Sequence, residues 1–216
     1  MHVHVNAAVS VDGKLSTRRR EQLAISGPED FARMERVRAA SDAVLVGVGT
    51  VLADDPSLLR HDERHRRNLG KEGLPARVIA DSRARTPPDA AILEGPAVTY
   101  LLVTDRAPDD RVDTLRTAGA EIRTVGDDRV NLAAAVEMLA HDGHERLMIE
   151  GGGEVIFSAF EAGIVDELTL FIGSLVVGGR EAPTLVDGEG FIEEFPQLDL
   201  REVERLDDGV VLSYDA

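Results

Sequence analysis

Three consecutive glycines follow Glu150 in the stretch "LMIEGGGEVI", between an apolar segment and the start of an amphipathic one. Backbone amides at such a strand-to-helix junction, together with the helix dipole, bind anions and most often phosphate. A tight turn that needs a positive φ angle explains the same glycines without any ligand. The triplet Gly151–Gly153 therefore leaves two interpretations open, a phosphate site and an ordinary turn.

A second glycine-bearing strand end occurs in "VGVGTVLADDPSL", where an apolar run reaches Gly47 and Gly49. Thr50 then adds a hydroxyl and Asp54 a carboxylate. Ligands of open α/β sheets bind outside the carboxyl ends of the strands, so two such ends in one chain favour a common ligand site. The alternative is a polar surface turn with solvated aspartates.

Basic side chains are candidates for phosphate binding. The chain has two lysines against 22 arginines, and Lys14 lies in the turn "SVDGKL". A functional lysine is therefore one hypothesis, beside that of a surface residue in a turn. Arginine binds phosphate through its planar fork, although single arginines are more often partners in surface ion pairs. The arginines considered for phosphate are Arg38, Arg60, Arg83 and Arg85.

The residue types exclude several chemistries. The chain has no cysteine, which excludes thiolate catalysis, cysteine-based zinc sites and disulfides. His61 and His65 are four residues apart, but "HDERH" has its glutamate at the wrong offset for an H-E-x-x-H zinc site and lies in a loop-like segment. The chain also lacks a G-x-S-x-G motif. We therefore expect no metal site and no serine hydrolase.

Alternating strands and helices must position these groups. Helices are predicted from Pro28, near 108–118, over "NLAAAVEMLAHDG" with Asn131 as its cap and Gly143 beyond its end, and over "EVIFSAFEAG". Residues 60–75 are charged, lack periodicity and are predicted to form a long loop. Apolar or alternating runs predict strands at "HVHVNAAVS", "DAVLVGVGT", "ARVIADS", "AVTYLLVT", "AEIRTV", "LMIE" and "VDELTLFIGSLVV".

Two alternating runs around Asp208-Gly209 predict a C-terminal β-hairpin. Strands that alternate with helices elsewhere predict parallel pairing. The expected fold class is therefore α/β, with a mixed, mostly parallel central sheet flanked by helices and closed by an antiparallel C-terminal hairpin. No repeat or linker divides the chain, so residues 1–216 are expected to form a single domain.

Composition limits the partners. The 216 residues are 43% hydrophobic and carry a net charge of −16. Such a surface repels nucleic acid and anionic membranes, and no apolar run approaches the roughly 20 residues that span a bilayer. The N-terminus lacks a secretory pattern, so a cytoplasmic protein is expected. High acidity with few lysines is typical of halophilic proteins, although a GC-rich genome also contributes to it.

Five motifs, in order, resemble those of the riboflavin-biosynthesis reductase family, over nearly the whole chain. They are "NAAVSVDGKL", "DAVLVGVGTVLADDPSL", "RVIADSRARTP", "IEGGGEVIFSAF" and "VDELTLFIGSLVVGGREAPTLVDGEGF". The chain is most similar to the archaeal and fungal branch, and its acidity then implies a haloarchaeal source. Bacterial members are commonly fused to a zinc deaminase domain, whose cysteine ligands this chain lacks.

The resemblance implies a dihydrofolate-reductase-like fold, a homodimer, NADPH as cofactor and a phosphorylated ribosylaminopyrimidine as substrate. The substrate opens to an imine, which hydride reduces to a ribitylamine. By the family pattern, the expected catalytic residues are Lys14, Asp54 and Glu150. The expected substrate-binding residues are Asn6, Arg60 and Arg38, the last for the 5′-phosphate. The expected cofactor-binding residues are Thr50, Asp54, Asp81, Ser82, Arg83, Val125, Gly151, Gly152, Gly153 and Glu154.

One segment departs from the family pattern. Where the family often has "DDPxLTxR", this chain has "DDPSLLRH", with Leu59 at the threonine position and His61 at the arginine position. The phosphate contact in this segment is then Arg60, His61 or neither.

Two kinds of alternative function remain. One is a reductase of the same fold that acts on the deaminated pyrimidine or on a pterin such as dihydrofolate. The other is a non-catalytic nucleotide-binding protein. An aromatic content of 4% argues against a folate pocket. The presence of Lys14, Asp54 and Glu150 argues against a loss of catalysis.

Overall fold

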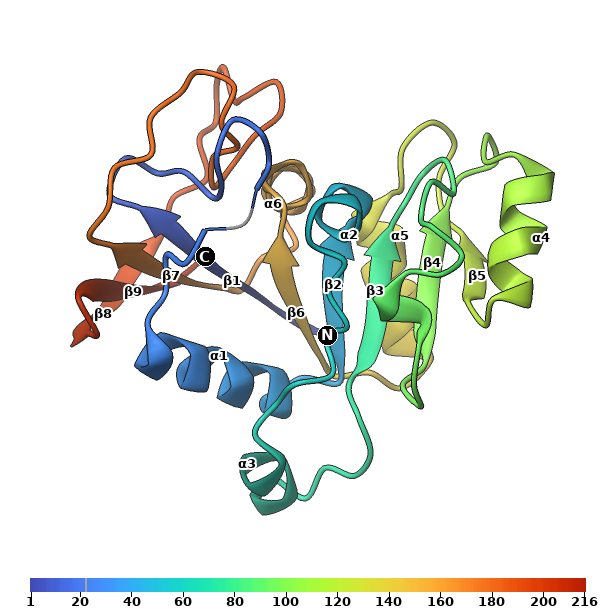
Figure 1. Cartoon of the computed structure of the whole chain (residues 1–216), viewed down its shortest axis with the longest axis horizontal. Coiled ribbons are helices and arrows are strands. Elements are labelled where there is room, and N and C mark those ends of the chain that lie inside the picture. The colour runs from blue at the N-terminus through green and yellow to red at the C-terminus, as the bar shows by residue number, and fades with distance from the viewer. Residues whose placement is uncertain (22) are drawn as a thin grey trace.

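The computed structural model describes residues 1–21 and 23–216. Over these described residues, nine strands form one sheet in the order β5-β4-β3-β2-β6-β1-β7-β9-β8 (Figure 1). The strands from β5 to β7 run parallel, and β9 pairs antiparallel with both β7 and β8. The strands are β1 (His2–Ser10), β2 (Ala43–Gly47), β3 (Ala76–Ala80), β4 (Thr99–Val103), β5 (Glu121–Thr124), β6 (Arg146–Gly151), β7 (Glu167–Gly173), β8 (Asp199–Leu206) and β9 (Gly209–Asp215). The helices are α1 (Pro28–Ala40), α2 (Val48–Asp54), α3 (Glu63–Asn68), α4 (Asp109–Thr117), α5 (Leu132–His141) and α6 (Gly153–Glu161), with a 3₁₀ turn η1 (Ala91–Leu93).

Helices cover both faces of the parallel part of the sheet. On one face, Val5 and Ile149 pack with Ile156 and other residues of α5 and α6. On the other face, Val46 and Met148 pack with apolar residues of α1, α2 and α4. Parallel strands are buried on both faces, which explains their continuous apolar runs. The predicted mixed, mostly parallel sheet and the predicted C-terminal hairpin are both confirmed.

The strand predicted over "DAVLVGVGT" is wrong in its second half. β2 ends at Gly47, and the residues from Val48 onward form α2. Gly47 is paired with Ala80, the last residue of β3, and the register with β6 shifts near Val46. Sheet partners therefore end at this point, and the backbone groups of the following residues are satisfied by helical hydrogen bonds instead.

The long loop predicted over 60–75 is also wrong in part, because Glu63–Asn68 form α3. The Asp62 carboxylate caps this helix by accepting a hydrogen bond from the His65 backbone N–H at 2.8 Å. Arg66 of α3 is buried and donates to the carbonyl oxygens of Ala39 and Ser41 at 3.0 and 2.7 Å. Tertiary contacts with the end of α1 thus stabilise a helix that has no apolar periodicity.

The C-terminal hairpin caps α1. Asp207 lies in the turn between β8 and β9, and its carboxylate accepts hydrogen bonds from the backbone N–H groups of Glu29 at 3.2 Å and Asp30 at 2.9 Å. First-turn amides have no partner within their own helix, and a negative charge there complements the helix dipole. A Cβ on Gly27 would lie 2.4 Å from the Asp207 Cγ, so the approach of the turn depends on this glycine.

We expect Gly27→Ala to lower the free energy of unfolding by roughly 1–3 kcal/mol, because the methyl group displaces Asp207 and removes the cap. The φ angle of Gly27 is −90°, which alanine adopts freely, so backbone strain does not contribute. Urea denaturation measures the change. Gly49→Ala is the matched control, since a Cβ there meets open space. Unchanged stability of the Gly27 variant would contradict the proposed capping contact.

Candidate active site

The two predicted glycine loops lie side by side at the carboxyl edge of the sheet. β2 and β6 are neighbours, and Val46 is paired with Gly151. α2 follows β2 directly, and α6 begins at Gly153, directly after β6. A Cβ on Gly152 would lie 3.6 Å from the Thr50 Oγ1 of α2, with no other non-neighbouring atom of the described residues within 4 Å. The fold thus joins the two segments into one backbone surface with open space at Gly152.

The three glycines of the triplet differ in what they require. Gly151 has a φ angle of 131°, which favours glycine, and the peptide bond between Gly151 and Gly152 is cis. Gly153 is enclosed, because a Cβ there would lie 2.3 Å from the carbonyl oxygen of Thr184. Gly151 and Gly152 both have room around them among the described residues, but the φ angle of Gly152 is −77°, which other residues also adopt. The triplet therefore combines both interpretations, a turn at Gly151 and accessible backbone at Gly152.

The connection between β7 and β8 closes one side of this surface. The Asp187 backbone N–H donates to the carbonyl oxygen of Gly153 at 3.1 Å. Thr184 forms an isolated bridge with Lys14, whose Nζ donates to the carbonyl oxygen of Ala182 at 3.1 Å. The fold thus links Lys14 to the glycine triplet through Thr184, whose carbonyl oxygen lies against Gly153. Residues 174–191 of this connection belong to the fifth of the family motifs, but no role at the site was predicted for them.

Glu150 and Arg38 form a largely buried ion pair beside the glycines. The Arg38 Nε donates to one oxygen of Glu150 and Nη2 donates to the other at 2.6 Å. The two side chains are only 13% and 11% exposed. Burial alone would lower the pKa of Arg38, but the Glu150 carboxylate raises it above its ordinary value. Nη1 donates to the carbonyl oxygen of Arg60 at 3.0 Å, so two of the five guanidinium N–H groups have no acceptor among the described residues and remain for a ligand.

Asn6 lies next to Glu150 on the same face of the sheet. Val5 of β1 is paired with Ile149 of β6, so the residues that follow them point side by side toward α1. Arg33 of α1 donates from Nη1 to the Asn6 Oδ1 at 2.8 Å. Two arginines of one helix thus contact polar side chains on two neighbouring strands. Sequence reasoning did not identify Arg33, which has no motif of its own.

The predicted cofactor residues of β3 and β5 lie farther along the same edge. Asp81 is fully buried, and its Oδ2 accepts hydrogen bonds from the Thr86 N–H and Oγ1 at 2.7 and 2.8 Å. Asp81 therefore shapes the turn that presents Ser82 and Arg83. The Arg83 side chain is 46% exposed, whereas Val125 is buried.

Three other predicted residues are exposed around the site. Asp54 is the last residue of α2, and partial burial raises the pKa of Asp54 above its ordinary value. The Arg60 side chain is 83% exposed and pairs with Glu35 at 2.8 Å. Glu154 lies in the first turn of α6, 4.0 Å from Arg129. Their exposure allows these side chains to turn toward a ligand.

Metal ligands do not gather in the described part of the chain. Within residues 1–21 and 23–216, no group of three or more histidine, aspartate or glutamate side chains could hold a metal ion. Over the same residues, none of the helices has the length and apolar character needed to cross a bilayer.

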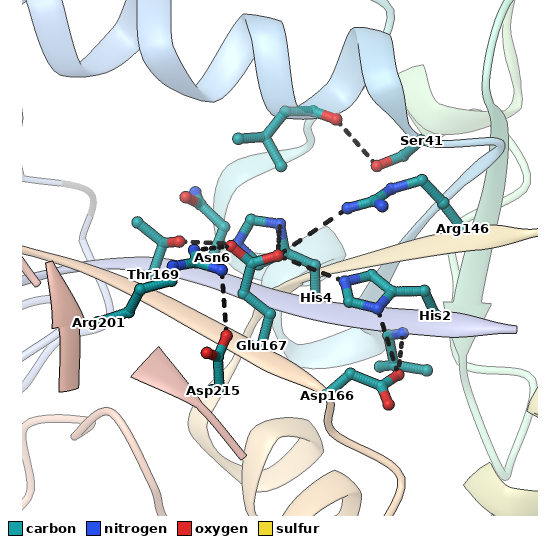
Figure 2. A network of polar contacts seen from close by, with 12 residues as sticks. His2, His4, Asn6, Ser41, Arg146, Asp166, Glu167, Thr169, Arg201 and Asp215 are labelled. Atoms are coloured by element: carbon teal, nitrogen blue, oxygen red, sulfur yellow. Dashed lines mark hydrogen bonds and ion pairs between the residues drawn. The ribbon is translucent and has the colours of Figure 1, made fainter. Parts of the chain in front are cut away.

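A polar network lies on the α1 face beside Asn6 (Figure 2). Glu167, at the start of β7, accepts a hydrogen bond from Arg201 at 2.5 Å and lies 3.8 Å from the His4 Nδ1. Burial alone would raise the pKa of Glu167, but the hydrogen bond from Arg201 and the nearby histidine lower it. His4 contacts the Thr169 hydroxyl at 2.8 Å, and burial lowers the pKa of His4 to about 4. His4 is therefore neutral at pH 7 in the folded protein.

The lowered pKa of His4 predicts a loss of stability in mild acid. Between pH 6.5 and pH 4 the unfolded chain binds a proton at His4 that the folded protein does not, so stability falls as the pH falls through this window. From 6.5 to about 4, the contribution is on the order of 1–3 kcal/mol. The His4→Gln variant should show a flatter dependence of the free energy of unfolding on pH. An identical pH dependence would contradict a neutral, buried His4.

Comparison with known families gives a match over most of the chain. Residues 1–212 match the family model described as the RibD C-terminal domain. The chain is 41% identical over 215 residues to the 2,5-diamino-6-ribosylamino-4(3H)-pyrimidinone 5′-phosphate reductase of Archaeoglobus fulgidus, covering 98% of this chain and 96% of the relative. It is also 41% identical to the reductase of that name from Methanothermobacter thermautotrophicus, covering 99% of this chain and 97% of the relative.

A solved structure supports the fold. Acinetobacter baumannii RibD superposes with a TM-score of 0.81 at 24% identity, over 99% of this chain and 57% of that one. The chain thus spans little more than half the length of that protein. This similarity, to a reductase domain of dihydrofolate-reductase-like fold, confirms the predicted fold class.

Proposed function

Because the chain belongs to the RibD C-terminal domain family and is a reductase of riboflavin biosynthesis, we propose that it reduces 2,5-diamino-6-ribosylamino-4(3H)-pyrimidinone 5′-phosphate with NADPH. The product is the corresponding ribitylamino compound. The substrate assignment is supported by two archaeal relatives of that name, which the chain matches over nearly their whole length. A cytoplasmic location is part of the proposal, as is usual for biosynthetic enzymes that use NADPH.

The cofactor side of the proposal rests on the edge formed by α2 and α6. NADPH supplies a hydride when bound, and the protein aligns it with the substrate and excludes water. The open space at Gly152 allows phosphate oxygens to approach the backbone at the start of α6. Thr50, Ser82 and Arg83 would hold the rest of the cofactor along the same edge.

The substrate side rests on Asn6, Arg38 and Glu150. Reduction requires the ribosylamine to open to an imine, which moves a proton to the ribose ring oxygen. In this proposal Glu150 manages that proton or orients sugar hydroxyls, and the remaining N–H donors of Arg38 bind the 5′-phosphate. The observation that carries the proposal is that the buried Glu150–Arg38 pair and the open Gly152 lie only two residues apart at the end of one strand.

The test is NADPH oxidation with three substrates side by side, in dilute buffer and in molar salt. We expect turnover of the 2,5-diamino compound, slower turnover of the deaminated pyrimidine and none of dihydrofolate. The net charge of −16 leads us to expect higher activity in molar salt, where screening reduces self-repulsion. Turnover of the deaminated compound alone would reassign the substrate. A protein that turns over neither pyrimidine is not this reductase.

The proposal includes a homodimer, supported by an apolar face at the C-terminal hairpin. Val203 of β8 is paired with Leu212 of β9, which is paired with Leu170 of β7, so the three side chains point to the same face. Val203 and Leu200 are 58% and 56% exposed. Exposed apolar residues next to the core are typical of an interface between subunits.

Sedimentation measures the oligomeric state directly. We expect the wild-type protein to sediment as a dimer and Val203→Glu to sediment as a monomer, because a charge in an apolar interface has no partner. Glu204→Gln on the same strand is the matched control and should remain dimeric. A monomeric wild-type protein would contradict this part of the proposal.

A further inference from the structure

Arg33 of α1 contacts Asn6, one of the residues proposed to bind the substrate. We infer that Arg33, held by Asp30, is a positioning residue that orients the Asn6 side-chain amide, so that its NH₂ group faces the substrate. The inference rests on the proposed function for the identity of the substrate. The orientation of Asn6 itself is argued from contacts within the protein.

The orientation of Asn6 follows from the chemistry of its partner. A guanidinium group has only donors, so the atom of Asn6 that lies 2.8 Å from the Arg33 Nη1 must be the amide oxygen. The amide nitrogen then points away from Arg33. Asn6 is 6% exposed, which makes an exchange of its two amide positions costly.

Arg33 is itself fixed by a second buried group. The Asp30 Oδ1 accepts a hydrogen bond from the Arg33 Nε at 2.9 Å and forms an ion pair with Nη2 at 2.7 Å. The Ser26 hydroxyl donates to the other oxygen, Oδ2, at 2.5 Å. The Arg33 and Asp30 side chains are 13% and 4% exposed. A planar guanidinium held at two of its nitrogens has little freedom in how it presents the third.

The Asn6 side chain lies beside a carboxylate, where a hydrogen-bond donor complements the acceptors already present. Asn6 follows Val5, which is paired with Ile149, and so lies beside Glu150. Glu150 contributes acceptor atoms to this part of the site, whereas the Asn6 NH₂ contributes two donors. An oxygen of the substrate, on the sugar or on the pyrimidinone, is the acceptor that this pair of donors fits. Without Arg33, the amide could rotate and present its oxygen instead, next to a carboxylate.

The test is a double-mutant cycle of Arg33→Met and Asn6→Ala, read as kcat/KM for the pyrimidine substrate. We expect each single variant to lose about tenfold or more, and the double variant to be no slower than Asn6→Ala alone. The NADPH dissociation constant should not change. A loss from Arg33→Met of the same size in both backgrounds would show that Arg33 acts through stability instead, and would overturn the inference.

A second measurement does not depend on turnover. The chain has three asparagines, so the side-chain NH₂ resonances of Asn6 can be assigned by substitution. Arg33→Met should shift these resonances, whereas Arg36→Met on the same helix should leave them and the activity unchanged. Unshifted Asn6 resonances in Arg33→Met overturn the inference even if the protein reduces the proposed substrate. Shifted resonances without turnover would leave the positioning intact and reject the proposed function.

Discussion

Glu150→Gln is expected to lower kcat for the pyrimidine substrate by about 10²-fold or more, while the NADPH dissociation constant remains unchanged. A group that transfers a proton in the transition state typically contributes about 10²–10⁴-fold, and a glutamine cannot take up or return that proton. It can still accept one hydrogen bond from Arg38, so the variant should fold. A loss of stability of up to about 3–5 kcal/mol is expected, because the variant leaves the largely buried charge of Arg38 without its partner.

The kinetic constants separate the two roles that Glu150 could have. If it only holds Arg38 in place for the phosphate, KM for the substrate rises and kcat is retained. If the carboxylate acts at the reacting carbon, kcat falls. Glu161→Gln at the end of α6 serves as the matched control, because it removes a charge far along the helix from the glycines. Full activity of Glu150→Gln would remove this carboxylate from the mechanism.

Local patterns were sufficient to predict features that depend on neighbouring residues. Asn131 was predicted to cap a helix, and its Oδ1 accepts a hydrogen bond from the Ala134 N–H at 3.1 Å. Gly143 was predicted just beyond the end of that helix, where it has a φ angle of 94°. The glycine loops were recognisable for the same reason, since strand, turn and helix start follow one another along the chain.

Contacts between distant segments could not be predicted in this way. Asp207 and Asp30 are 177 positions apart, and nothing in the turn around Asp207 indicates that it caps a helix. Arg38 was predicted to bind the substrate 5′-phosphate and Glu150 to be catalytic, but their pairing across 112 positions became visible only in the fold. For Asp81, the fold adds a contact that the motif does not indicate. The motif predicts a cofactor contact, whereas its burial and its hydrogen bonds to Thr86 point to a role in shaping the turn.

The second large effect is expected at Gly152. Replacing it with alanine should weaken NADPH binding by about tenfold or more, because a methyl group would occupy the space through which the cofactor reaches the backbone. In the protein without cofactor, the one atom of the described residues that this methyl group meets outside its neighbours is the Thr50 Oγ1, at 3.6 Å, which is an ordinary contact. Alanine is a poorer N-cap than glycine, so stability should fall by about 1 kcal/mol. Fluorescence titration with NADPH and urea denaturation measure the two quantities.

Gly153→Ala is the informative comparison, because the same methyl group one residue later meets protein instead of open space. It would lie 2.3 Å from the carbonyl oxygen of Thr184, so the connection between β7 and β8 must move. This variant should therefore lose more stability than Gly152→Ala. If the cofactor approaches the backbone at Gly152, the main effect of Gly152→Ala is on NADPH affinity. The main effect of Gly153→Ala is on stability. Wild-type NADPH affinity in a folded Gly152→Ala protein would mean that the cofactor does not contact this loop, and would leave Gly151–Gly153 as a turn alone.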